Sequence, residues 1–241
     1  EKLGATSIEA MRDISGDRIL AASGVAPGSA IVIDGDHITG SASETFAASK
    51  HSDVPVMLGF TRDERFANLG PAKSVAEYEA VVRAAFPAKA DAVLKAYPAK
   101  DEASVQRALV DLMRDMSVGR QMYLWAEANQ RWGKAPAYAY FFTRRQPYVS
   151  GIAFADHDPA TVGAYHHGEV PYFLRTLESL NLFRKTRDWS DEDRALSDSM
   201  SNAILQFAKT GHPGWAAFDA KKPKVMRFDF DGGMIDWPNA K

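Results

Sequence analysis

The stretch VPVMLGFTRDE, residues 54–64, decides the fold class of this chain. From Val54 to Phe60 it is apolar throughout, and polar residues stand on both sides of it. An uninterrupted apolar run of this length is typical of a strand that is buried on both faces of a parallel sheet. Pro55 stands near the start of this run, where its missing backbone N–H costs no hydrogen bond of the sheet. The charged residues that follow stand at the carboxyl end of the strand, where open α/β sheets place functional side chains.

Further strands are predicted on both sides of this one. Residues 137–142, AYAYFF, alternate small and aromatic side chains, which predicts a second strong strand. Weaker patterns predict strands at 30–33, before an Asp-Gly turn, and at 225–230. The fold class is therefore α/β with a mostly parallel sheet. Because so few strands are predicted, we expect them to form part of a sheet and not a whole one.

Helical periodicity fills most of the remaining chain. A short amphipathic segment at 5–22 breaks at a Ser-Gly pair, and residues 190–209 have a capping pattern at Ser190. Between the two strong strands, residues from about 74 to 132 form a helical insert that we expect to break near Gly119. We expect its helices to lie outside the sheet and to cover the mouth of a pocket.

The composition excludes several classes of function. The 29 Lys and Arg residues and the 31 Asp and Glu residues give a net charge of −2. The basic excess that binds nucleic acid or an anionic membrane is therefore missing. The chain has no cysteine, which excludes disulfides, thiolate metal sites and a cysteine nucleophile. No apolar run approaches the roughly 20 residues of a membrane span. We predict no nucleic-acid partner, no membrane span and no cofactor.

The segment GAYHHGEVPYF, residues 163–173, contains the histidine pair of greatest interest. One interpretation is a polar loop that caps a helix, with Glu169 in the first turn. A second is a metal site formed by His166, His167 and Glu169, although their spacing is neither HExxH nor HxxEH. A third is a catalytic base, because the glycine permits a close approach and the aromatic residues offer an apolar wall.

Glu64, at the end of the first strong strand, also has two interpretations. It could form a salt-bridged strand edge with Arg62 or Arg65. It could instead be the acid of a catalytic triad, since a carboxylate after one strand and a histidine in the loop after a later strand form the acid–base half of a triad. In α/β-hydrolases the chain order is serine, acid, histidine, and Glu64 precedes His166 as that order requires.

The third member of such a triad would be a serine upstream of Glu64 in a Gly-x-Ser-x-Gly elbow. That pattern occurs nowhere in the 241 residues, and an HGGG-type oxyanion loop is missing as well. Ser23 and Ser150 are the nucleophiles to consider if the chain proves active by itself.

Four motifs in order over residues 31–213 resemble the type-B carboxylesterases, the family of the cholinesterases and para-nitrobenzyl esterases. The stretch at 33–35 (IDG) is similar to the "viDG" before the family's acid strand, and 54–64 resembles "vPvliG-x-x-x-DE". The stretch at 163–173 resembles "GAxHxxE/D-x-P-Y-x-F", and 207–213 (FAKTGHP) resembles "nFaktGdP".

The resemblance implies an α/β-hydrolase fold and carboxylic-ester hydrolysis by a Ser-His-Glu triad. Glu64 falls on the family's acid and His166, not His167, on its base. The substrate would be a small-molecule ester. Two departures stand out: Arg65 occupies a position where the family usually has glycine, and the N-terminal half with the oxyanion loop and the nucleophile is missing.

We therefore expect residues 1–241 to be the C-terminal portion of one α/β-hydrolase domain, completed by an N-terminal segment of the same esterase that carries the serine. The alternative is a non-catalytic cholinesterase-like interaction protein or an inactive truncated fragment. An intact Glu64 and His166 favour the enzyme. Because the first residue is Glu1 and not methionine, a preceding signal would not be visible, and we leave the localisation open between the secreted, the periplasmic and other compartments.

Overall fold

The computed structural model describes residues 3–23 and 31–239, which divide between Thr45 and Phe46 into two compact units. The first unit contains α1 (Ile8–Arg12), α2 (Gly16–Ser23) and the beginning of α3 (Ala42–Ala47). The predicted break between its first two helices is confirmed. The division of the chain into domains stays a prediction.

The strand predicted at 30–33 is wrong for the residues that the structure describes. Residues 31–33 form no regular element, and Ile31 is 80% exposed. A strand needs a neighbour for its backbone groups, and no strand of the described chain pairs with this segment. The predicted turn after it is present, because Oδ1 of Asp34 accepts hydrogen bonds from the backbone N–H groups of Asp36 and Ile38. Residue 30 lies outside the described residues.

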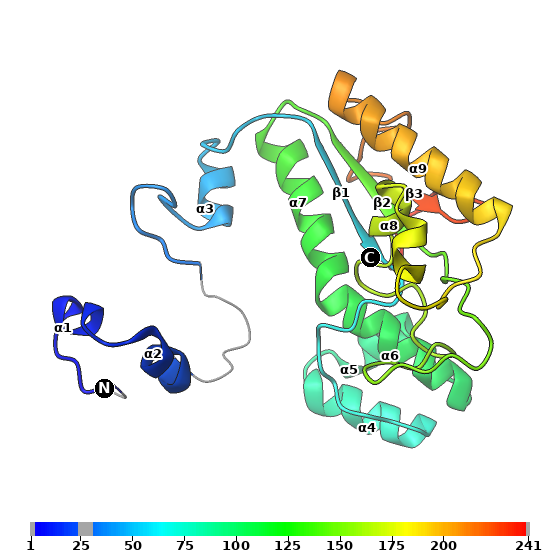
Figure 1. The fold of residues 1–241 in the computed structure, drawn as a ribbon, viewed down its shortest axis with the longest axis horizontal. Coiled ribbons are helices and arrows are strands. Elements are labelled where there is room, and N and C mark those ends of the chain that lie inside the picture. The colour runs from blue at the N-terminus through cyan, green and yellow to red at the C-terminus, as the bar shows by residue number, and fades with distance from the viewer. Residues whose placement is uncertain (1–2, 24–30, 240–241) are drawn as a thin grey trace. The chain divides into compact units, whose positions relative to one another are not determined.

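The second unit is built on a four-stranded sheet. Its strands, in spatial order, are β1 (Val56–Thr61), β2 (Ala137–Phe142), β3 (Lys224–Phe228) and β4 (Gly233–Asp236). β1 and β3 both run parallel to β2, and β4 is antiparallel to β3. The mostly parallel α/β sheet is confirmed, and β1 and β2 lie side by side in Figure 1. The sequence did not predict β4, which follows a turn at residues 229–232.

The insert is helical, as predicted. It consists of α4 (Val75–Ala85), α5 (Ala90–Ala96), α6 (Glu102–Met116) and α7 (Val118–Trp132). The break falls at Ser117, whose backbone leaves the helical region and whose hydroxyl donates to the carbonyl of Met113, while Gly119 is buried inside α7. α4 to α6 form a core cluster of their own.

The insert lies outside the sheet, as predicted, but the expectation that all of it covers the mouth of a pocket is wrong for α7. This helix packs against β1 and β2, and its fully buried Ala126 shares a core cluster with Phe60 and Ala139 of those strands. A strand buried on both faces needs an apolar cover on each of them. The insert therefore supplies the cover of one face.

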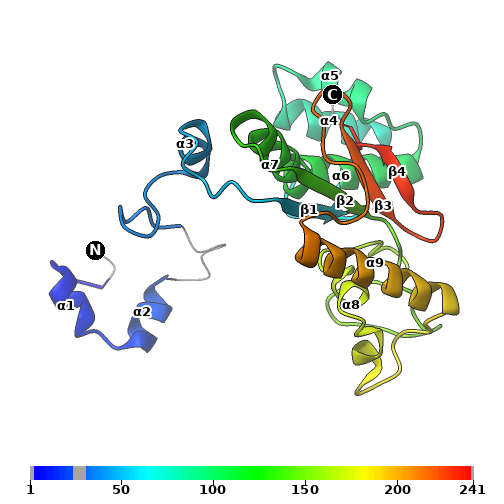
Figure 2. The same cartoon turned by 90° about the horizontal axis from the view of Figure 1, so that it is seen from above.

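The opposite face is covered by the C-terminal helices. They are α8 (Val170–Phe173), the 3-10 helix η1 (Leu177–Asn181) and α9 (Asp191–Thr210). Figure 2 shows α8 and α9 on one side of the sheet and α6 and α7 on the other. Phe142 of β2, Tyr172 of α8 and Met200 of α9 are all fully buried in the same cluster.

The predicted capping box of α9 is present at Ser190, and Asp193 of that box anchors the end of β2. Its buried carboxylate receives hydrogen bonds from the Arg144 guanidinium at 2.7 and 3.0 Å and from the Tyr172 hydroxyl at 2.7 Å. Burial would raise the pKa of Asp193, but these hydrogen bonds outweigh it and hold the pKa below its usual value. The segment between β2 and α9, which contains the histidine pair, is thus tied down at both ends.

Candidate active site

Glu64 is buried just past the end of β1, with 1% of its surface exposed. Its Oε1 accepts a hydrogen bond from the backbone N–H of Thr61 at 3.1 Å, which folds the side chain back over the strand end. A carboxylate that is buried this completely needs a partner, since an isolated buried charge is strongly disfavoured.

His166 is that partner. Its Nδ1 lies 2.8 Å from Oε2 of Glu64, and Oε2 makes no hydrogen bond within the described residues. The imidazole is 40% exposed, so its outer edge is accessible while its inner edge faces the carboxylate. Phe66 packs edge-on against the ring, with 4.6 Å between the ring centroids. The two residues that the sequence singles out are therefore adjacent in the structure, although 102 positions separate them in the chain (166 − 64 = 102).

His167 differs from His166 in its backbone conformation, its exposure and its lack of an ion pair among the described residues. Its backbone has a φ of 67°, the residue is exposed, and it forms no ion pair among the described residues. Its ring lies against that of His166, with 3.8 Å between the centroids and the planes tilted by 34°. Among the described residues, only the first histidine forms an ion pair with Glu64.

Asp63 fixes the loop that carries His166. Its backbone N–H donates to the carbonyl of Ala164 at 3.0 Å, and its Oδ2 accepts from the backbone N–H of Ala164 at 2.7 Å. These two hydrogen bonds fix Ala164, which stands two residues before His166 in the loop. Because Asp63 and Glu64 are adjacent, one end of β1 positions both partners of the pair.

The insert contributes to the same corner through α6. Arg107 donates to Oδ1 of Asp63 at 2.5 Å and forms a bidentate pair with Asp111 at 2.8 and 2.9 Å. The buried Arg114 reaches the same Asp111. Asp63 therefore has a balanced charge, and α6 braces the turn after β1. No pattern in the sequence pointed to Arg107, because its partner lies 44 residues away.

Two more groups share the surroundings of the pair. Burial raises the pKa of Glu169 above its usual value, the Glu64 carboxylate raises it further, and His166 acts in the opposite direction. Burial also raises the pKa of Tyr140, with Glu169 and Glu64 adding to the effect. Glu169 and Tyr140 are thus close enough to the pair for their pKa values to respond to its charges.

The remaining sequence candidates do not join the pair. Ser150 is exposed in a turn and forms no hydrogen bond to His166 within the described residues, and the side chain of Ser23 lies outside the description. In the part of the chain that the structure covers, no group of three His, Asp or Glu side chains gathers in a way that could hold a metal ion. None of the described helices combines the length and the apolar character of a membrane span.

Gly163 should be sensitive to substitution because it lies against Asp63. Its φ is 71°, and a Cβ at this position would clash with Oδ2 of Asp63. We expect Gly163→Ala to lower the free energy of unfolding by about 3 kcal/mol, through left-handed strain and the clash together. Urea unfolding followed by tryptophan fluorescence measures this loss.

Gly151→Ala is the matched control for that substitution. Gly151 has nearly the same φ, 74°, but open space where a Cβ would be. We expect it to show the backbone strain without the clash, about 1 kcal/mol. Equal losses for the two variants would contradict the proposed role of the contact between Gly163 and Asp63.

Known proteins of similar sequence include two esterases. The chain is 30% identical over 196 residues to fumonisin B1 esterase of Sphingopyxis macrogoltabida and 25% identical over 198 residues to para-nitrobenzyl esterase of Bacillus subtilis. Each match covers 77% of this chain but only 34% and 36% of the respective relative, so the chain spans about a third of their length. The carboxylesterase family matches residues 7–239. This chain therefore belongs to the carboxylesterase family.

Proposed function

We propose that this chain supplies the acid, Glu64, and the base, His166, of a Ser-His-Glu triad that hydrolyses carboxylic esters. The observation that carries the proposal is the 2.8 Å approach of Nδ1 of His166 to a carboxylate that is 1% exposed. Membership of the carboxylesterase family supports the reaction class. A salt-bridged strand edge would instead pair Glu64 with an arginine, and no arginine in the described chain forms an ion pair with it.

In the proposed reaction each residue has a distinct task. Since Nδ1 of His166 faces Glu64, Nε2 is the nitrogen that takes the proton of a serine hydroxyl as its oxygen attacks the ester carbonyl. The same imidazole then gives this proton to the departing alcohol, and it activates water for hydrolysis of the acyl-enzyme. Glu64 stays ionised, orients the ring and stabilises the imidazolium that forms during each step.

We further propose that the serine lies on a segment outside these 241 residues. The sequence has no Gly-x-Ser-x-Gly elbow, and the chain spans about a third of its relatives. β1 stands at the edge of the described sheet, although its apolar sequence is typical of a central strand. A parallel strand of the proposed segment would pair with that edge and carry the serine to His166.

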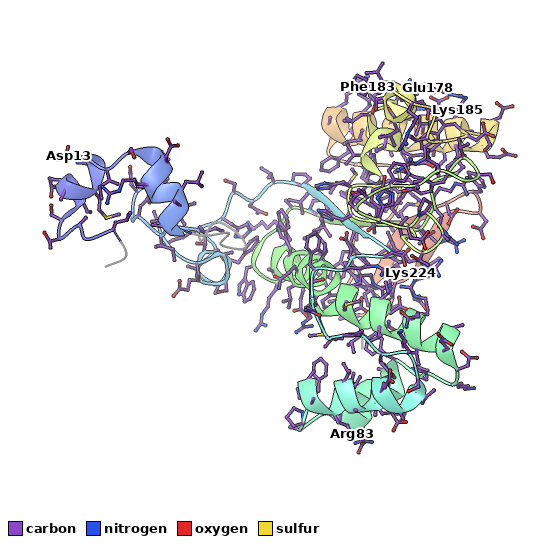
Figure 3. The ribbon with its side chains drawn as sticks, turned by 60° about the horizontal axis from the view of Figure 1, so that its bottom comes forward. Asp13, Arg83, Glu178, Phe183, Lys185 and Lys224 are labelled. Atoms are coloured by element: carbon purple, nitrogen blue, oxygen red, sulfur yellow. The ribbon has the colours of Figure 1, made fainter. Side chains whose placement is uncertain are left out.

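The surface also has apolar side chains that a partner segment could cover. Phe183, which follows η1, is 99% exposed and projects from the surface in Figure 3. Leu182 beside it and Leu174 after α8 are exposed as well. Both belong to the stretch that continues from the histidine loop. Exposed apolar groups in sequence-adjacent positions support a contact with the remainder of an esterase.

Complementation tests the proposed division of the triad. Residues 1–241 should release 4-nitrophenol from 4-nitrophenyl valerate no faster than buffer does. Adding the proposed N-terminal segment should restore hydrolysis, because the serine and the base then meet. Labelling with a fluorophosphonate, followed by mass spectrometry, should place the modified serine on the added segment.

The control is the same segment with the elbow serine changed to alanine, which should restore no activity. Full activity of residues 1–241 by themselves would contradict the proposal and direct the search to Ser150 or Ser23. A complex that forms but shows neither hydrolysis nor labelling would favour the non-catalytic interaction protein.

A further inference from the structure

A cavity of about 220 Å³ opens beside His166. It is lined by Asp63, Arg65, Phe66, Val162, Tyr165 and His166. A space that adjoins the proposed base is where a part of the ester next to the scissile bond would lie. Its chemistry should therefore bear on which esters are cleaved.

Arg65 gives this cavity a positive charge that no carboxylate of the described residues neutralises. Its guanidinium donates to the backbone carbonyl of Thr161 at 2.9 Å, and it forms no ion pair within the described residues. A carbonyl orients the guanidinium but leaves its charge and most of its five donors available. Arg65 is exposed, so a ligand can reach it.

The other charged groups nearby do not cancel this charge. Asp63 lines the same cavity, but its carboxylate is occupied by Arg107 and by the backbone of Ala164. Asp158, in the turn that contains Thr161, accepts from the backbone N–H of Ala160 and makes no ion pair in the described chain. Glu64 is turned inward to His166.

The path from His166 to Arg65 is apolar. Phe66, the next residue after Arg65, touches the imidazole edge-on, and Val162 lines the same space. A short hydrocarbon chain fits against such a wall, and a carboxylate at its end would meet the guanidinium in a bidentate pair.

We propose that Arg65 is a carboxylate-binding subsite, and that the esterase prefers esters carrying a carboxylate a few carbons from the scissile bond. The inference rests on the proposed function, because it assigns a substrate class to that site. Half-esters of dicarboxylic acids are the simplest members of this class.

Two matched substrate pairs test the preference in the complemented esterase. In the first pair, mono-4-nitrophenyl glutarate carries a carboxylate on its acyl side, and 4-nitrophenyl valerate is the neutral reference. In the second pair, the valerate ester of 5-hydroxy-2-nitrobenzoic acid carries the carboxylate on its alcohol side, and the reference is again 4-nitrophenyl valerate. The preference is the kcat/KM for the charged ester divided by the kcat/KM for the neutral ester. In at least one pair, Arg65→Gln should lower this preference by about tenfold.

Two further measurements address the charge itself. Arg65→Lys should retain part of the preference, because it keeps the charge but loses the planar fork. Added NaCl should reduce the preference of the unmodified enzyme, since an exposed ion pair is screened by salt.

Arg145→Gln is the matched control. Arg145 is also exposed and donates to the backbone carbonyl of Ala160 in the same turn at 2.7 Å, but it does not line the cavity. The preference for the charged ester over the neutral ester should not change in this variant. An equal change in both variants, or no change for Arg65→Gln in either substrate pair, would overturn the subsite.

Binding separates failure of the subsite from failure of the proposed function. Monomethyl glutarate is titrated into the protein while the Nε–H resonance of Arg65 is followed by NMR. If no ester is cleaved but this resonance shifts at saturation, the proposed function fails and the subsite stands. If 4-nitrophenyl valerate is cleaved but the resonance does not move, the subsite fails and the proposed function stands.

Discussion

Replacing His166 by asparagine should lower kcat for 4-nitrophenyl valerate by about 10⁴- to 10⁶-fold in the complemented esterase. Asparagine has no group that can take the serine proton, and the nucleophile would remain a neutral hydroxyl. The imidazole is 40% exposed, so the fold should tolerate the change. Stopped-flow release of 4-nitrophenol measures the loss, and near-UV circular dichroism checks the fold.

His167→Asn is the control for that substitution. The two histidines are adjacent and their rings are in contact, but His167 makes no ion pair with Glu64 in the described chain. Its φ of 67° is one that asparagine adopts more readily than most residues, so the change should cost little in backbone strain. We expect kcat to stay within about threefold. If His167→Asn caused the larger loss, the assignment of the base would have to be exchanged between the two residues.

Replacing Glu64 by glutamine should lower kcat by about 10⁴-fold. The amide is close to the carboxylate in shape, and its oxygen can still accept the hydrogen bond from the backbone N–H of Thr61. What is lost is the negative charge 2.8 Å from Nδ1 of His166, which stabilises the imidazolium in the transition state. The amide would also favour the wrong tautomer of the ring. KM should change little, because Glu64 is buried and does not reach the substrate.

Glu64→Asp separates charge from geometry. It retains the carboxylate but shortens the side chain by one methylene, which moves the charge away from the imidazole. We expect kcat at saturating 4-nitrophenyl valerate to lie between the value for the unmodified enzyme and the value for Glu64→Gln. Activity of Glu64→Gln within about tenfold of the unmodified enzyme would show that another group orients His166, and Glu169 would then be the nearest candidate.

Features that depend on neighbours in sequence were predictable without a structure. β2 begins and ends at the predicted residues 137 and 142, since alternating aromatic side chains favour an extended backbone within a single strand. α9 begins after the predicted cap at Ser190, because a capping box spans only four residues. The candidate acid and base were predicted from motif resemblance and chain order, and the structure places the two side chains 2.8 Å apart.

The failures fall where a residue's environment comes from distant parts of the chain. The apolar residues 31–33 have the composition of a strand but no strand to pair with in the described structure. α7 was expected over the mouth of a pocket but packs on a face of the sheet, because periodicity shows which helix face is apolar but not what covers that face.

The sequence by itself therefore determined the α/β class, the helical insert and the identity of the candidate acid and base. Only the tertiary structure decided that Asp63 and Arg107 brace the histidine loop and that Arg65 stands uncompensated in a cavity beside His166. Helix periods, caps and turns arise from contacts over a few residues, so they can be inferred locally. Ion pairs and cavities depend on which segments of the folded chain approach one another, and that depends on packing the whole core.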